Sequence, residues 1–134
     1  FKDIDFIYNN AYKYENKIIV GTRGWSFGED AESQKMIQRE VARLELSIKN
    51  GIENYGADKE IIAFLHYPPI INQNIQNNEM NEFIRMLKKY EIKRCYYGHL
   101  HSIAIKEAVE GEDFGIHFQL VSADALDFNL VKVE

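Results

Sequence analysis

The sequence predicts an α/β fold in which a parallel βαβαβ unit is followed by antiparallel strands. Up to residue 97, apolar runs typical of buried strands alternate with segments of helical periodicity, and this order implies parallel strands joined by right-handed crossovers. Beyond residue 102, short apolar runs are separated by turn residues, as in antiparallel strands. The 134 residues suffice for one domain with a buried core, so we treat residues 1–134 as a single domain.

The first elements are expected to form a β-hairpin. Alternate residues of Ile4–Tyr8 are apolar, which is typical of a half-buried strand, and Lys17–Thr22 contains the second apolar run. Asn9 and Asn10 supply turn residues between the two runs. The sequence therefore predicts two strands joined by a long loop.

A long amphipathic helix is predicted over Asp30–Tyr55. Acidic residues gather at its amino end, where the helix dipole favours negative charge, and Gly56 is a stop signal at its carboxyl end. Apolar residues recur at spacings of three and four, which places them on one face of the helix. The residues of this apolar stripe are Ile37, Val41, Leu44, Ile48 and Ile52.

Two further strands and a second helix complete the parallel unit. Ile61–Leu65 is apolar at every position, as expected of a strand buried on both faces, and two prolines soon follow it. Asn72–Asn78 is polar and is predicted to be a loop. A helix is expected from about Asn78 to Lys89, and Lys93–Tyr97 is the next strand.

The last third of the chain is predicted to contain three antiparallel strands. These are Ile103–Val109, Phe114–Val121 and Leu126–Val133, with Glu110–Asp113 as the first turn. Residues 115–120 alternate strictly between apolar and polar, so one face of that strand is expected to be buried. His117 falls on the polar face and is not expected to take part in chemistry.

Composition and charge argue against several classes of function. The formal net charge of −5 disfavours a nucleic-acid partner, which requires a basic face. No apolar run approaches the about 20 residues of a membrane-spanning helix. Cys95 is the only cysteine, so no internal disulfide can form, and it lies inside an apolar run like a core residue. A cytoplasmic protein without a nucleic-acid or membrane surface is expected.

Histidines mark the ends of two strands of the predicted parallel sheet. His66 directly follows Ile61–Leu65, and the run Gly98-His99-Leu100-His101 follows the next strand. Ligands bind at the carboxyl ends of parallel strands, and imidazoles hold metals or polarise phosphates. His66, His99 and His101 are therefore candidate metal ligands. The alternative is that they are ordinary histidines of surface loops.

The glycine-punctuated loop of residues 22–28 and a later turn hold further candidates. Arg23 is a candidate substrate ligand, because a guanidinium binds phosphate through two N–H groups. Alternatively, Arg23 binds loop carbonyls while Trp25 covers the edge of the core. Asp124 and Asp127 are expected to stabilise their own turn through Asx hydrogen bonds rather than to bind a metal.

Two motifs at the ends of predicted strands resemble those of a known family. They are Phe64-Leu65-His66-Tyr67-Pro68-Pro69 and, one helix later, Tyr97-Gly98-His99-Leu100-His101. In this order they resemble the carboxyl half of calcineurin-like metallophosphoesterases. Two other segments are similar to a bacterial predicted-phosphohydrolase branch of that family: Gly21-Thr22-Arg23-Gly24-Trp25 and Val121-Ser122-Ala123-Asp124. The resemblance implies that the chain is the C-terminal part of a β-sandwich flanked by helices.

The resemblance also implies a ligand set and a substrate class. His66 and His99 would ligate one metal of a dinuclear centre and His101 the other, with a phosphate ester as substrate. The metals would be divalent Mn, Fe or Zn ions, two in a complete site and at most one in this chain. The family's motifs Asp-x-His, Gly-Asp-x-x-Asp and Gly-Asn-His-Asp/Glu do not occur in the sequence. A missing N-terminal segment or a partner chain is expected to supply them.

Two functions of different class therefore remain open. One is a phosphoesterase whose active domain this chain completes, and the other is a non-catalytic fragment or assembly module that binds at most one metal or anion. An incomplete sheet is expected to expose strand edges at Ile18–Val20 and Ile61–Leu65. Burial of such an edge predicts a homo-oligomer.

Overall fold

The computed structural model describes residues 4–133, which form one mixed sheet with helices. The strands lie in the spatial order β1-β2-β3-β4-β6-β5. Those strands are β1 (Tyr12–Tyr14), β2 (Lys17–Thr22), β3 (Glu60–Leu65), β4 (Arg94–Tyr97), β5 (Gly111–Asp113) and β6 (Ile116–Leu120). The helices are α1 (Ala31–Tyr55), α2 (Asn72–Gln76), α3 (Glu82–Lys89) and the 3₁₀ helix η1 (Ser102–Glu107).

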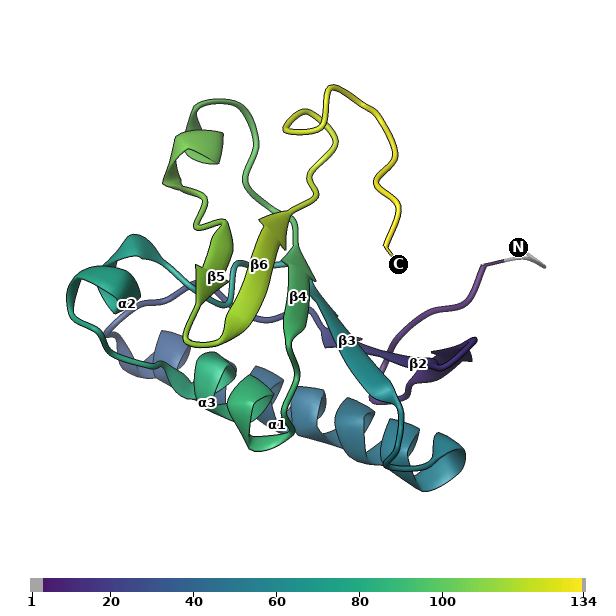
Figure 1. Ribbon diagram of the computed structural model, residues 1–134. Coiled ribbons are helices and arrows are strands. Elements are labelled where there is room, and N and C mark those ends of the chain that lie inside the picture. Colours follow the sequence, from purple (N-terminus) through teal and green to yellow (C-terminus); the bar gives the residue numbers. More distant parts are fainter. Residues whose placement is uncertain (1–3, 134) are drawn as a thin grey trace.

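Four neighbouring strands of the sheet, β2, β3, β4 and β6, run parallel. The short strands β1 and β5 pair antiparallel to β2 and β6 and form the two edges. Figure 1 shows α1 and α3 packed along the sheet, while the segments after β4 and β6 gather beyond the tips of those strands. The predicted α/β class and its βαβαβ unit are therefore confirmed. In the part of the chain that the structure describes, no helix is long and apolar enough to span a bilayer.

Helix α1 forms where the sequence predicts it. Asp30 is its N-cap, and the Asp30 carboxylate accepts a 2.9 Å hydrogen bond from the backbone N–H of Ser33. Ile37, Leu44 and Ile48 of the predicted apolar stripe are buried against the sheet. Gly56 ends the helix at φ 96°, a conformation that residues with a Cβ rarely adopt.

Strands β2 and β3 lie inside the sheet, so the expectation of exposed edges there is wrong. Strand β2 pairs with β1 on one side and β3 on the other, and β3 pairs with β2 and β4. Ile18 and Val20 of β2 and Ile62 and Ala63 of β3 are fully buried. Continuous apolar runs here reflect burial within the described sheet rather than a surface left open for association.

The first predicted strand, Ile4–Tyr8, is wrong. These residues have no regular structure, and their apolar side chains at positions 4, 6 and 8 are more than half exposed. The partner of β2 is instead Tyr12–Tyr14, joined to it by a tight turn in which Glu15 has φ 53°. Alternation of apolar residues alone did not predict the strand correctly. In a hairpin, the segment that pairs with β2 is the one directly connected to it by the tight turn.

Most of the predicted antiparallel region is also different. Ile103–Val109 is not a strand, since Ser102–Glu107 forms η1, and Leu126–Val133 contains turns without a strand. The predicted turn Glu110–Asp113 contains strand β5. The actual turn is Phe114-Gly115, and both of its residues have positive φ, as a two-residue hairpin turn requires.

Only the middle strand of that region keeps its predicted place. Residues 116, 118 and 120 of β6 are buried, as the alternation predicts. However, β6 pairs in parallel with β4. The connection through η1 and β5 returns the chain to the end of the sheet where β4 begins, so that β6 runs in the same direction as β4. The polar segment Asn72–Asn78, predicted to be a loop, contains the short helix α2.

Gly51 is predicted to be essential for the contact between α1 and β2. A Cβ at this position would lie 2.5 Å from Cγ2 of Ile18 and 3.0 Å from Cβ of Ala11. We expect Gly51→Ala to lower the free energy of unfolding by about 1 kcal/mol or more, because overpacking outweighs the gain in helix propensity. Denaturant unfolding measures the change. Asn54→Ala, at an exposed position of the same helix, is the control and should not destabilise the protein; equal stability of Gly51→Ala and wild type would contradict the packing argument.

Candidate functional site

The three candidate histidines lie at the carboxyl ends of the central parallel strands, and we call this end of the sheet the histidine edge. His66 follows β3, and His99 and His101 follow β4, its parallel neighbour. The Gly98 N–H donates to the carbonyls of both Leu65 and His66, at 3.2 and 3.1 Å, and this holds the two strand ends together. His99 has φ 71°, a left-handed conformation that reverses the chain after β4.

His66 and His99 face one another. Their nitrogens, Nε2 of His66 and Nδ1 of His99, are 3.3 Å apart, and which one donates depends on the tautomer. The Tyr67 ring packs against both imidazoles, with centroid distances of 5.0 Å to His66 and 4.3 Å to His99. Trp25 lies beside Tyr67 at 5.7 Å. The two imidazoles are thus packed against the Tyr67 ring, which in turn contacts Trp25.

His101 is bound to a carboxylate from a distant loop. Its Nδ1 lies 2.7 Å from Oδ1 of Asp124, and the backbone N–H of Ser102 donates to Oδ2 of the same carboxylate at 2.6 Å. The Asp124 carboxylate therefore acts beyond its own turn, to which the sequence analysis assigned it, and ties the segment after β6 to the segment after β4. These hydrogen bonds, that from Ser102 foremost, hold the pKa of Asp124 below its ordinary value.

The local electrostatics favour a neutral imidazole at His66. Partial desolvation lowers the pKa of His66, and the nearby His99, His101 and Arg23 lower it further. A neutral imidazole has one nitrogen lone pair free to accept a hydrogen bond or to bind a metal. His66 is thus suited to be a ligand near neutral pH.

Arg23 extends from the end of β2 toward the same edge. Its guanidinium lies over the Trp25 ring, 4.7 Å from the centroid, and its backbone carbonyl accepts a 2.9 Å hydrogen bond from the Tyr67 N–H. Within residues 4–133, the side chain forms no ion pair or hydrogen bond. The structure therefore does not show the alternative in which Arg23 binds loop carbonyls, and the guanidinium stays available to an anion.

The two imidazole nitrogens are separated by a distance that two ligands of one metal ion also have. Two ligands at tetrahedral positions, each about 2.0–2.1 Å from Zn²⁺, lie about 3.3–3.4 Å apart, which matches the separation of the His66 and His99 nitrogens. However, residues 4–133 contain no group of three or more His, Cys, Asp or Glu side chains arranged to hold a metal. The 3.3 Å contact is also a hydrogen bond between the two rings, so the match is one of separation only, and a tetrahedral site requires further ligands.

His117 lies apart from the other histidines. It is part of β6, where its register partner is Arg94 at the beginning of β4. Because β4 and β6 run parallel, this position is toward the opposite edge of the sheet from His99 and His101. His117 provides a histidine outside the candidate site for comparison.

Glu40 is a buried charge that the sequence analysis missed. Its side chain is 1% exposed, accepts a 2.9 Å hydrogen bond from Arg43, and accepts another from the Thr22 hydroxyl at 3.1 Å. A signal was present, because Glu40 lies three residues after Ile37 and four before Leu44, on the apolar stripe of α1. An acidic residue on such a stripe needs a buried partner.

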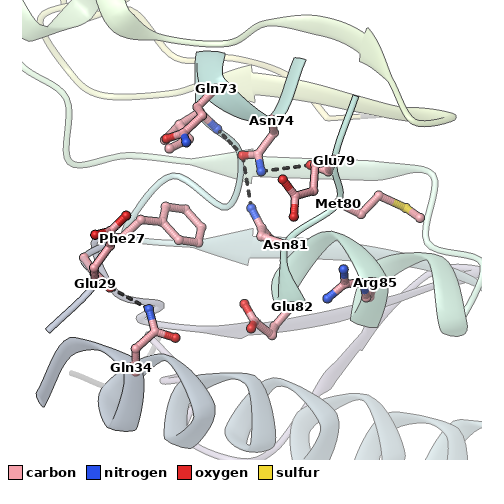
Figure 2. A pocket seen from close by; sticks show the side chains of 12 residues that line it. Phe27, Glu29, Gln34, Gln73, Asn74, Glu79, Met80, Asn81, Glu82 and Arg85 are labelled. Carbon is pink, nitrogen blue, oxygen red and sulfur yellow. Dashed lines mark hydrogen bonds between the residues drawn. The ribbon is translucent and has the colours of Figure 1, made fainter. Parts of the chain in front are cut away.

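A separate cavity lies near α2, and its polar side chains are already used in hydrogen bonds that hold the fold. Figure 2 shows amide, acidic and apolar side chains around it, contributed by α2, α3 and the segments before them and at the start of α1. Asn74 receives hydrogen bonds from Ile71 and Asn81, and Asn81 in turn caps α3 by accepting from the Ile84 N–H. Because these amides already hold the loop between α2 and α3, we assign no ligand to this cavity.

Comparisons with known proteins do not place the chain in a family. No protein-family model matches it, and neither a curated protein nor a solved structure does. The resemblance to the metallophosphoesterases therefore rests on the motif residues themselves.

The pKa of His66 gives a test of the histidine pair. The unfolded chain binds more protons than the folded one between the depressed folded-state pKa and 6.5, so protonating His66 destabilises the fold as pH falls through this range. In a metal-free sample, NMR titration should show a His66 pKa below 6.5, and His99→Ala should raise it. His117→Ala is the control and should leave it unchanged. A His66 pKa that does not respond to His99→Ala would contradict the coupling.

Proposed function

We propose that this chain supplies the histidine ligands of a metal-dependent phosphoesterase. The convergence of His66 and His99 at the carboxyl ends of neighbouring parallel strands carries the proposal, because their spacing matches two ligand positions around one ion. The motif resemblance supports the same reaction class, hydrolysis of a phosphate ester. In this proposal His66 and His99 are ligands of one metal ion, and His101 is a ligand of the second ion of a complete site.

Each residue at the edge has a task in this function. His66 and His99 hold one divalent Mn, Fe or Zn ion, and Asp124 fixes the orientation of the His101 ring as an outer-shell carboxylate does for metal-binding histidines. Arg23 donates N–H groups to the phosphate of the substrate. A bound divalent ion supplies Lewis acidity toward the phosphoryl group. Imidazoles are neutral, so anionic ligands from an N-terminal segment or a partner chain must balance the charge of two close cations.

An assembly module that binds at most one metal or anion is the second candidate. It is favoured by one observation, namely that only two nitrogens converge among the described residues. A homo-oligomer is part of either proposal, because a second copy is one possible source of the further ligands. A cytoplasmic location also stays a proposal, based on the single cysteine of the sequence. That cysteine, Cys95, is fully buried, and burial raises the pKa of its thiol, which leaves it inert.

Metal binding tests the ligand assignment. We expect the protein to bind Zn²⁺ or Mn²⁺ in calorimetry, and His66→Ala or His99→Ala to weaken binding by about tenfold or more, as the loss of a ligand does. His101→Ala should weaken it several-fold, and His117→Ala should have no effect. Absence of binding, or equal loss in all four variants, would remove the proposed site.

Catalysis separates the two candidates. Because the chain by itself lacks anionic bridging ligands, we expect it to hydrolyse p-nitrophenyl phosphate negligibly even with added Mn²⁺. Adding the acidic motifs, on a longer chain or on a partner, should restore turnover that His99→Ala abolishes. Turnover by the chain alone would show that it contains or shares enough ligands, whereas failure of every completed form would favour the assembly module.

A further inference from the structure

A second cavity lies on the other side of Arg23, between the end of β2 and helix α1. Its volume is about 400 Å³, within the range of small-molecule sites. The backbone of Gly21 and Thr22 borders it, and three arginines line it: Arg23, Arg39 and Arg43. None of the candidate histidines contributes to its lining.

The charge of the lining is strongly positive for a protein with a formal net charge of −5. Of the three arginines, only Arg43 has a carboxylate partner, which is Glu40 at 2.9 Å. Arg23 and Arg39 form no ion pair with any residue that the structure describes. Three guanidinium groups and one carboxylate leave a net charge of about +2, which matches a phosphate monoester carrying −1.5 to −2 at neutral pH.

The buried Glu40 indicates that the cavity is a built feature. A carboxylate that is 1% exposed costs free energy unless it is paired, and Glu40 is satisfied by both Arg43 and Thr22. These two bonds join α1 to the last residue of β2 and hold the Arg43 guanidinium at the cavity. The Arg43 side chain is only 23% exposed, so its position is restricted.

Aromatic rings restrict two of the three guanidiniums. Arg23 lies over Trp25 at 4.7 Å, and Arg43 lies over Tyr8 at 5.5 Å. A guanidinium packed on a ring keeps its edge N–H groups free, and those groups match the oxygens of phosphate bidentately. Preorganised donors lower the entropy cost of binding.

We propose that this cavity binds the phosphate group of a small phosphate monoester, through Arg23, Arg39 and Arg43. Binding here requires no metal, and the inference does not depend on the proposed phosphoesterase activity. Arg23 is the one residue that lines this cavity and is also assigned to the substrate phosphate at the histidines, so its substitution affects both proposals, whereas Arg39 belongs to the cavity alone.

Calorimetry with glycerol phosphate in the presence of EDTA tests the proposal. Arg39→Ala and Arg23→Ala are the test variants, because neither side chain has an ion-pair partner within residues 4–133 whose loss would disturb folding. We expect each to weaken binding by about tenfold or more, since each removes charge-assisted hydrogen bonds. Arg85→Ala, at an exposed arginine of α3 outside the cavity, is the matched control and should change affinity by less than about twofold.

The remaining outcomes contradict the proposal. If His99→Ala abolishes binding while Arg39→Ala does not, the phosphate binds at the histidines. If glycerol phosphate does not bind below about 10 mM, an affinity weaker than small-ligand sites show, the cavity is not a phosphate site. Malonate that binds as tightly as glycerol phosphate would show that the cavity does not select phosphate over other dianions. A null result for metal binding in the separate zinc titration leaves each of these outcomes interpretable.

Discussion

The parallel pairing of β3 with β4 is the interaction on which the rest of the structure depends. It brings Leu65 opposite Tyr97. The backbone N–H of Gly98, the next residue, then donates to the carbonyls of Leu65 and His66 at the end of β3. Without this register, the histidines that follow the two strands would emerge at different heights. Strand pairing therefore brings the two imidazoles close together, and the loop backbone after each strand sets the orientation of the rings.

Two kinds of polar chemistry are placed next to each other at this edge of the sheet. On one side, His66 is kept neutral by desolvation and by its basic neighbours. On the other side, permanently charged guanidiniums surround a cavity. Arg23, Trp25, Tyr67 and His99 form a continuous series of ring contacts between the two.

Buried charge joins the helical layer to this edge. Glu40 would cost stability on the apolar stripe of α1 if it were alone, but its bonds to Thr22 and Arg43 compensate for that cost. Asp124 has a comparable effect, because it connects the segment after β6 to His101 and Ser102. Both carboxylates are spread over the fold rather than collected at one metal site. Among residues 4–133, only the two imidazole nitrogens of His66 and His99 lie together, with no carboxylate beside them.

Local sequence patterns determined the elements that depend on burial. The period of 3.6 residues placed α1 and its buried face, and the apolar runs placed β2, β3 and β4 in parallel order. Because the carboxyl ends of parallel strands share one edge, the sequence also determined that His66 and His99 lie together. Only the tertiary structure decided the position of β6 beside β4, the pairing of His101 with Asp124, and the bond from Thr22 to Glu40. These contacts join residues 18 to 23 positions apart, and a local sequence period does not specify which residues meet across such a separation.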